Sequence, residues 1–185
     1  IKSTDWSVVS GKHGPGSVAE ELDPVAKWDF GPVNDAIAGV FPLPFPTVYS
    51  EPYSSIEGVA RCRLVAVPKT RTTPRLIGIE PVGHQWIQQS IKDELYRAFE
   101  RMPVCSLSSQ EPNRLLAEIG SYEGELATLD LSEASDRVSN DLVLRLFGQY
   151  PHFLRAIQAC RTRETVLPDG TIVTLNKYAS MGSAL

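Results

Sequence analysis

Two aspartates near the middle of the chain are suited to metal-dependent chemistry. In the stretch LATLDLSEASD, Asp130 ends the apolar-rich segment 125–130, and Asp136 follows six residues later. If residues 125–130 form a β-strand, the strand end holds the Asp130 carboxylate on a rigid platform. Proteins commonly bind Mg²⁺ through one or two carboxylates together with substrate phosphates. The pattern indicates a magnesium site at Asp130, with Asp136 placed to accept a hydrogen bond from a substrate hydroxyl.

The same stretch is also typical of a helix start. Ser132, Ser135 and Asp136 carry side-chain oxygens that can accept hydrogen bonds from free backbone N–H groups. A negative charge is also favourable at the N-terminal end of a helix. Spacing alone therefore leaves helix capping and metal binding both open for this stretch.

A basic segment and a loop of small residues add groups that bind phosphate. Residues 61–75 contain five basic residues and no acidic ones, whereas residues 1–60 contain three against eight. Lys69, Arg71 and Arg75 could bind triphosphate oxygens, although basic residues also protect exposed strand edges. The small residues of loop 180–183 would allow close approach of backbone to a nucleotide. Carboxylate, cations and loop together are what nucleotidyl transfer requires.

Composition predicts a soluble globular protein in a reducing compartment. The 185 residues are 42% hydrophobic and 22% charged, which is enough for one sizeable core. The sequence contains no apolar run of roughly 18 residues and no signal-peptide pattern, so no membrane association is expected. Three separated cysteines without a CxxC pair, and three scattered histidines, argue against a disulfide framework, a zinc cluster or a catalytic triad.

The secondary structure expected in the first two thirds of the chain begins with loops. Residues 1–60 hold seven prolines and six glycines, which predicts at most short helices. Residues 61–69 and 75–81 are expected to form two strands joined by a basic turn. Apolar residues four apart between 84 and 101 predict an amphipathic helix. Residues 111–119 predict a second helix, which Gly120 would end.

The last third is expected to alternate helices with a hairpin. Ser139 is the predicted N-cap of a helix whose apolar stripe comprises Val138, Leu142, Leu146 and Tyr150. Pro151 would start the next helix. The turn LPDG predicts a hairpin within residues 161–177. Because no regular βαβ repeat is visible, the predicted fold class is α+β, with helices packed on an antiparallel sheet.

Four stretches in order, VPKTRTTPRLIGIEP, SSQEPNRLLAEIGS, LATLDLSEASDRVS and LPDGTIVTLNKYASMGSAL, resemble one known family. They are similar to the RNA-directed RNA polymerase, or replicase β subunit, of the single-stranded RNA bacteriophages (leviviruses). The upstream stretch KHGPGSVAE extends the resemblance. The resemblance implies a right-hand polymerase fold, represented here by the fingers and the first part of the palm, without the thumb.

The resemblance also implies a division of the chain into two regions. Residues 1–123 correspond to an N-terminal and fingers region, with an NTP-contacting segment at 61–80. Residues 124–185 correspond to an incomplete palm. The palm part comprises a first aspartate motif at 126–141, a hairpin at 161–177 and the start of a Ser/Gly loop motif at 179–185.

Residue roles follow from the same resemblance. Asp130 corresponds to a catalytic aspartate that binds the Mg²⁺ ions of a two-metal site, or Mn²⁺ in their place. Asp136 corresponds to a residue that helps to sense the ribose 2′-OH. The full set of implied nucleotide-binding residues is Lys69, Arg71, Arg75, Asp136, Ser180, Gly182 and Ser183.

The implied function is template-directed RNA synthesis that replicates a viral single-stranded RNA genome. The 3′-OH of the nascent strand attacks the α-phosphate of an NTP, and pyrophosphate leaves. The expected partners are RNA template and product, NTPs and, as in some relatives, host translation factors. The expected location is the cytoplasm of the infected bacterial cell.

The chain begins without Met and ends before the Gly-Asp-Asp motif of the family, so it is expected to be an inactive piece of a longer enzyme. Two alternatives stay open at this point. One is a polymerase of the narnavirus or ourmiavirus kind. The other is a non-catalytic RNA-binding remnant that binds phosphates through its basic segment in a salt-sensitive way.

Overall fold

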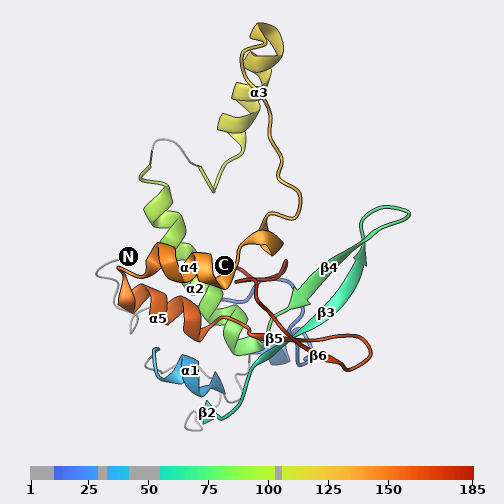
Figure 1. Cartoon of the computed structure of the whole chain (residues 1–185), viewed down its shortest axis with the longest axis vertical. Helices are drawn as coiled ribbons and strands as arrows, with labels where there is room; N and C mark the ends of the chain where they lie inside the picture. Colours follow the sequence, from blue (N-terminus) through green and yellow to red (C-terminus); the bar gives the residue numbers. More distant parts are fainter. Residues whose placement is uncertain (1–10, 29–32, 42–54, 103–105) are drawn as a thin grey trace.

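A computed structural model describes residues 11–28, 33–41, 55–102 and 106–185 (Figure 1). Helices and strands are mixed along the chain, which confirms the α+β class. The elements, in order, are η2 (Ala26–Trp28), β1 (Val33–Asn34), α1 (Asp35–Ala38), β2 (Ser55–Ile56), β3 (Arg61–Pro68), β4 (Pro74–Ile79), α2 (Val82–Phe99), α3 (Glu111–Glu123), η3 (Ser135–Arg137), α4 (Asn140–Phe147), α5 (Pro151–Ala159), β5 (Glu164–Val166) and β6 (Ile172–Thr174).

The main sheet has four strands in the order β4-β3-β5-β6. Both predicted hairpins are confirmed, because β3 pairs antiparallel with β4 and β5 pairs antiparallel with β6. The prediction of a wholly antiparallel sheet is wrong, since β3 and β5 pair in parallel. A parallel pair needs a long crossover, and the chain from α2 to α5 provides one. The sheet therefore unites strands from both of the regions predicted on either side of residue 123.

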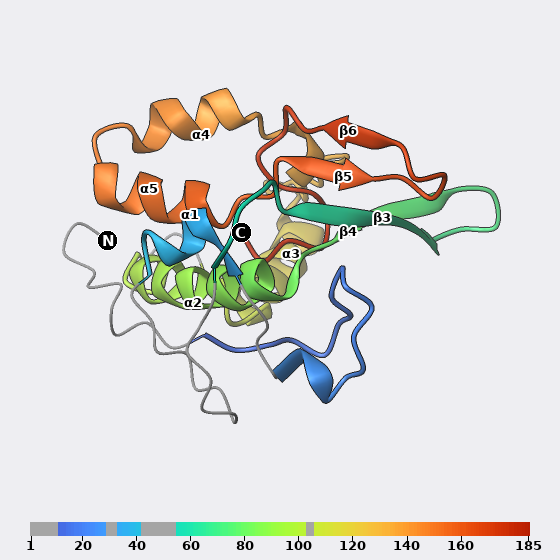
Figure 2. The same ribbon diagram turned by 90° about the horizontal axis from the view of Figure 1, so that it is seen from below.

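The hydrophobic core lies beside this sheet, where α1, α2 and α5 are grouped (Figure 2). The predicted helix 84–101 is confirmed as α2, and Ile87 and Ile91 from its apolar stripe are 1% and 0% exposed. They share the core with Phe153 and Ala156 of α5 and Ile37 of α1. The stripe leaves the core toward its C-terminal end, where Phe99 is 37% exposed. This packing anchors α2 directly after β4 and makes the helix the rigid support of the site described below.

The helices after α2 depart from the prediction in two ways. Helix α3 continues past Gly120 to Glu123, because Gly124, with φ of 70°, provides the left-handed C-cap. In α4, Ser139 is confirmed as the N-cap, since its hydroxyl accepts the Leu142 N–H at 3.1 Å. The predicted stripe of α4 is wrong, however, because the buried residue is Val143 and not Leu142. Packing against α5 determines which side of this short helix is buried.

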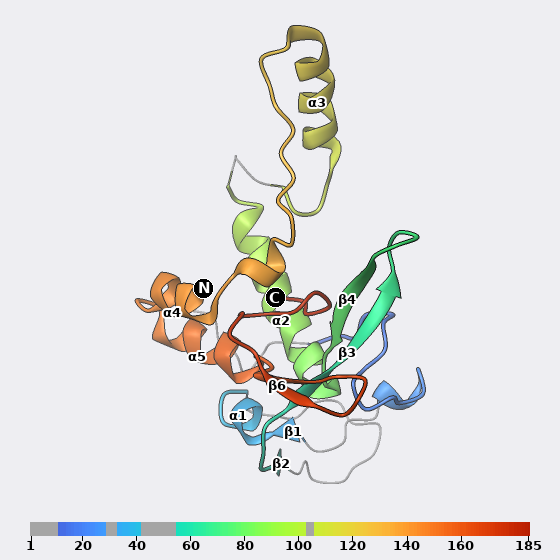
Figure 3. The same ribbon diagram turned by 45° about the vertical axis from the view of Figure 1, so that its right-hand side comes forward.

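The strand predicted at 125–130 is absent, so this prediction is wrong. Residues 125–131 have no regular secondary structure, and Leu129 and Leu131 are 86% and 75% exposed. Among the described residues no strand lies beside this segment, so its backbone groups have no ladder in which to pair. Leu126 lies against Gly120 of α3. We call residues 106–134 the α3 arm, which projects from the rest of the chain (Figure 3).

No helix within the described ranges is both long enough and apolar enough to cross a membrane.

Candidate nucleotide-binding site

The tip of the β3–β4 hairpin carries three predicted phosphate-binding cations. Lys69, Arg71 and Arg75 are all exposed, and none of them forms an ion pair with another described residue. Thr70 and Thr73 brace the turn, because the Thr70 hydroxyl accepts the Thr73 N–H at 3.0 Å and lies 2.6 Å from the Thr73 hydroxyl. Lys69 and Arg71 lie in this turn and Arg75 in the first part of β4, so three positive charges without a described ion-pair partner lie at this end of the hairpin, which suits an anionic ligand.

The other arginines of the basic segment have different surroundings. Arg61 Nε lies 2.7 Å from Glu164 of β5, and Arg63 lies 3.1 Å from Glu21. These ion pairs join the base of the hairpin to its neighbours. The sequence presents five basic residues as one segment, but the structure divides them into a paired base and an unpaired tip.

Asp130 lies in the exposed α3 arm. Its side chain makes no hydrogen bond or ion pair with any residue that the structure describes. A free, hard carboxylate oxygen suits Mg²⁺, which keeps several waters and binds substrate phosphates. Among all the residues that the structure describes, no group of three or more His, Cys, Asp or Glu side chains is placed to hold a metal. Asp130 thus fits as one ligand, and the remaining ligands would be phosphates, waters or other residues.

Asp136 is held in an ion pair. Its Oδ1 lies 2.6 Å from Lys177 Nζ, and the two side chains are 32% and 26% exposed. The capping role considered for Ser132, Ser135 and Asp136 is wrong, because η3 has no side-chain cap and Ser139 caps α4. Asp136 lies within the short η3 helix, several residues before the N-terminus of α4.

Backbone hydrogen bonds join the Asp136 region to the segment before the Ser/Gly loop. Tyr178 N–H donates to Val138 O at 2.7 Å, and Asn140 N–H donates to Asn176 O at 3.0 Å. Ser139 and Lys177 form an isolated antiparallel bridge. These contacts fix residues 138–140 beside residues 176–178. The chain that follows residue 175 lies between η3–α4 and β4 (Figures 1 and 3).

The Ser/Gly loop is docked on β4 and α2. Gly78 N–H of β4 donates to Met181 O at 2.8 Å. Ser180 is buried against Gly78, whereas Gly182 is exposed. The Ser183 hydroxyl lies 3.1 Å from Gln88 Oε1 of α2. The loop is therefore a supported element, and its backbone at Gly182 is the part that reaches solvent.

A buried polar network lies behind this loop, and sequence reasoning missed it. Gln88 donates to Cys160 O at 2.9 Å and accepts the Ala184 N–H at 3.2 Å. The Thr162 hydroxyl donates to Glu80, which is 3% exposed. Burial raises the pKa of Glu80 to about 7. Glu80 immediately follows β4, and a charged residue between two apolar elements was the signal available in the sequence.

Glu80 predicts a pH-dependent stability. Its ordinary pKa is 4.5 and its folded pKa about 7, so the folded state binds the proton more tightly. The stability from this group is complete below the unfolded pKa and is lost as pH rises through the folded one. We expect Glu80→Gln to become more stable relative to the wild-type protein from about pH 5 to about pH 8, measured as the difference in Tm.

Glu118→Gln is the matched control, because it also removes one carboxylate, but from an exposed side chain. His84 and every other titrating group are common to the wild-type protein and both variants, so the difference isolates the replaced side chain. A difference between Glu80→Gln and wild type that stays constant over this range would contradict the prediction.

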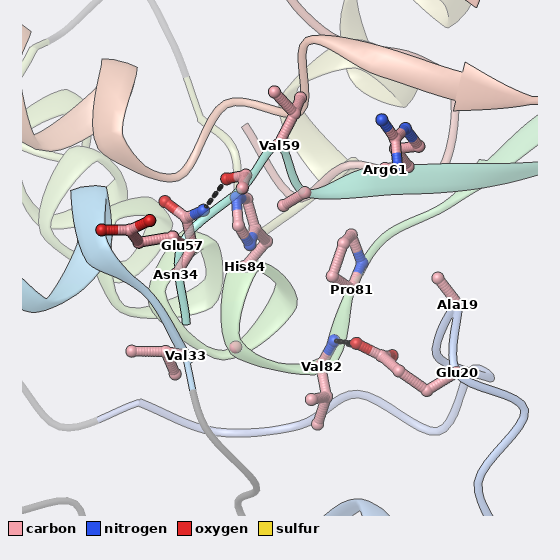
Figure 4. A pocket seen from close by; sticks show the side chains of 13 residues that line it. Ala19, Glu20, Val33, Asn34, Glu57, Val59, Arg61, Pro81, Val82 and His84 are labelled. Atoms are coloured by element: carbon pink, nitrogen blue, oxygen red, sulfur yellow. Dashed lines mark hydrogen bonds between the residues drawn. The ribbon is translucent and has the colours of Figure 1, made fainter. Parts of the chain in front are cut away.

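A separate pocket of about 420 Å³ lies at the N-terminal end of α2 (Figure 4). At one end the Glu20 carboxylate accepts the Val82 N–H at 3.1 Å. At the other end the Asn34 side chain donates to Gly58 O beside His84. Burial lowers the pKa of His84 to about 4, so its imidazole is neutral at physiological pH. Arg61, at the start of the predicted NTP-contacting segment 61–80, lines this pocket, whereas the individually predicted nucleotide-binding residues do not.

The structure brings together only part of the predicted site. Asp136 and the loop 180–183 are linked through residues 176–178. No hydrogen bond or ion pair between described residues links this cluster to the hairpin tip or to Asp130. The residues that contacts bring together are Asp136, Lys177 and the loop 180–183. The hairpin tip and Asp130 are exposed, and both precede this cluster in the chain.

Comparison with known proteins gives a consistent set of matches. A family model described as RNA replicase, beta-chain, matches residues 48–184. The RNA-directed RNA polymerase subunit beta of Enterobacteria phage SP is 39% identical over 121 residues, which cover 65% of this chain and 20% of that protein. The corresponding subunit of Escherichia virus Qbeta is 37% identical, with the same coverage. The RNA-directed RNA polymerase beta chain of Escherichia phage MS2 is 29% identical over 117 residues, or 63% of this chain and 21% of that protein. The chain spans about a fifth of the length of these relatives.

Proposed function

The chain belongs to the RNA replicase β-chain family, and from this premise we propose that the protein containing it copies an RNA template into RNA from nucleoside triphosphates. The observation that carries the proposal is the ion-paired cluster of Asp136, Lys177 and the loop 180–183 within the matched region. The RNA-directed RNA polymerases of phages SP and Qbeta match this chain across 121 residues. The proposed setting is viral genome replication in an infected bacterial cell, with host translation factors as further predicted partners.

We also propose the assignment of the chain to a right-hand polymerase. Residues 1–123 would belong to the fingers and residues 124–185 to the palm. The hydrogen-bonded sheet that crosses this boundary supports a rigid junction between the two, because β3 of the first region pairs with β5 of the second.

Each group of the site would have its own task. The cations at the hairpin tip would bind the triphosphate of an incoming nucleotide. The free oxygen of Asp136 would accept a hydrogen bond from the ribose 2′-OH, the group that distinguishes RNA from DNA. Asp130 would provide one carboxylate ligand for Mg²⁺ or Mn²⁺. The bound metal would stabilise negative charge on the reacting phosphate.

The test is incorporation of labelled NTPs by the full-length protein on an RNA template. We expect template-dependent RNA synthesis, and its absence under conditions where the protein is folded and binds RNA would favour the RNA-binding remnant instead. A narnavirus- or ourmiavirus-type polymerase shares this chemistry and stays an alternative prediction.

We expect no synthesis by the 185-residue chain alone, because two-metal catalysis needs several ligands and its described residues hold no group of three or more His, Cys, Asp or Glu side chains placed to bind a metal. Nucleotide addition by the purified 185-residue chain would overturn this expectation.

A further inference from the structure

We propose that Lys177 is a positioning residue that fixes the Asp136 carboxylate for recognition of the ribose 2′-OH. The inference rests on the proposed function, since it assigns the source of sugar specificity within the same site. Lys177 lies three residues before Ser180, in a segment that sequence reasoning had assigned only to a hairpin.

The contact is close and partly shielded from water. Lys177 Nζ lies 2.6 Å from Asp136 Oδ1, and about three quarters of the Lys177 side chain is buried. Charge-assisted hydrogen bonds of this length are among the stronger polar contacts in proteins. Asp136 forms no other ion pair with a described residue. The neighbouring Arg137 pairs instead with Glu133, at 3.8 Å and in a well-exposed position.

Hydrogen bonds hold the backbone that carries Lys177 from both sides. Arg161 donates to the carbonyl oxygens of Leu175 at 2.6 Å, Lys177 at 2.9 Å and Tyr178 at 3.2 Å. The opposite side of the segment is tied to residues 138–140 by the backbone hydrogen bonds described above. Lys177 therefore extends from a fixed, strand-like backbone toward Asp136, and its ammonium group is held there by the hydrogen bond to Asp136 Oδ1.

This geometry has a consequence for recognition of the sugar. A carboxylate has two oxygens, and Lys177 occupies Oδ1, so Oδ2 is left to accept a further hydrogen bond. Because η3 is a single short turn on the surface, the Asp136 side chain would otherwise sample several rotamers. Lys177 therefore holds the Asp136 side chain in one rotamer and leaves its Oδ2 free. A site built to bind a hydroxyl discriminates strongly against a ligand that lacks it.

The experiment compares Lys177→Met, Lys177→Arg and the matched control Arg137→Met in the full-length protein. For each we would measure kcat and KM for an NTP and for the corresponding 2′-deoxy-NTP on an RNA template. We expect Lys177→Met to lower kcat/KM for the NTP about tenfold, because a hydrogen bond to a charged group is weakened, and to leave kcat/KM for the 2′-deoxy-NTP nearly unchanged. Lys177→Arg should restore most of the preference, and Arg137→Met should keep it.

A double-mutant cycle separates positioning from a general structural role. In an Asp136→Asn background, Lys177→Met should cause no further loss of sugar preference, because Lys177 acts through Asp136. Equal losses with both nucleotides, or an additional loss in the Asp136→Asn background, would overturn the inference. If Lys177→Met reduces the folded fraction, judged by circular dichroism, Lys177→Gln replaces it in the same cycle.

The wild-type protein separates this inference from the proposed function. If the folded wild-type protein incorporates neither nucleotide, the proposed function itself fails, and the inference fails with it. If it incorporates NTPs and the sugar preference does not depend on Lys177, only the inference fails.

Discussion

RNA synthesis by the full-length protein is expected to fall at least about a thousandfold when Asp130 is replaced by alanine. If Asp130 is a metal ligand, its loss removes several kcal/mol of transition-state stabilisation, and about 4 kcal/mol corresponds to about a thousandfold in rate. Binding of RNA should be nearly unchanged, because the residue is an exposed anion that makes no contact with the cations at the hairpin tip. Single-turnover extension and filter binding at a fixed salt concentration would measure the two quantities separately.

The matched control is Glu125→Ala, which removes a carboxylate from the same exposed segment of the α3 arm. This variant should retain near wild-type synthesis. Asp130→Asn keeps the size of the side chain and removes its charge, so it should lose nearly as much activity as Asp130→Ala. Activity of Asp130→Ala within about threefold of wild type would show that the metal assignment is wrong.

The elements that local sequence signals specify are the ones that could be predicted. The β3–β4 and β5–β6 hairpins form between neighbouring segments joined by turn residues, and the apolar spacing that predicted α2 includes its core residues Ile87 and Ile91. The Ser139 cap is likewise a contact between residues three apart. Each of these features depends on residues close in sequence, so periodicity and turn chemistry were sufficient to find them.

The predictions that failed depended on distant partners. Residues 125–130 have the composition of a strand, but a strand exists only beside another strand, and the described residues place none there. The parallel β3–β5 pair joins residues about a hundred positions apart, which no local pattern indicates. In α4 the buried residue is set by contact with α5, so the apolar stripe read from spacing alone pointed in the wrong direction.

The same distinction applies to the candidate site. The candidate residues came from motifs, but the residues that hold them were invisible in the sequence. Lys177 contacts Asp136, 41 positions earlier in the chain, and Arg161 contacts Leu175 and Tyr178, 14 and 17 positions later. Gln88 supports the Ser/Gly loop from the buried face of α2, where an amphipathic pattern indicates only packing. Motifs therefore suggested which groups could meet the substrate, and the fold revealed which groups position them.

Replacing Gly182 with alanine is expected to displace the Ser/Gly loop from β4. Gly182 has φ of 115°, a conformation in which a side chain costs about 1–3 kcal/mol. A Cβ atom there would also lie 2.5 Å from Gly78 O and 2.8 Å from Ile77 Cγ2. Since the first of these atoms is backbone in a paired strand, the loop must move instead. Hydrogen–deuterium exchange of the full-length protein should show faster exchange at the Gly78 amide, and RNA synthesis should fall.

Gly170→Ala is the matched control for this change, because it separates backbone strain from steric conflict. Gly170 also has a positive φ, of 84°, but a Cβ atom there would meet nothing within 4 Å. It lies in the turn between β5 and β6, away from the Gly78–Met181 hydrogen bond. If the close approach of the loop to β4 is what requires glycine, exchange at Gly78 rises in Gly182→Ala and stays at the wild-type rate in Gly170→Ala. Equal exchange in the two variants would mean that the loop tolerates a side chain, and that its docking on β4 does not depend on glycine.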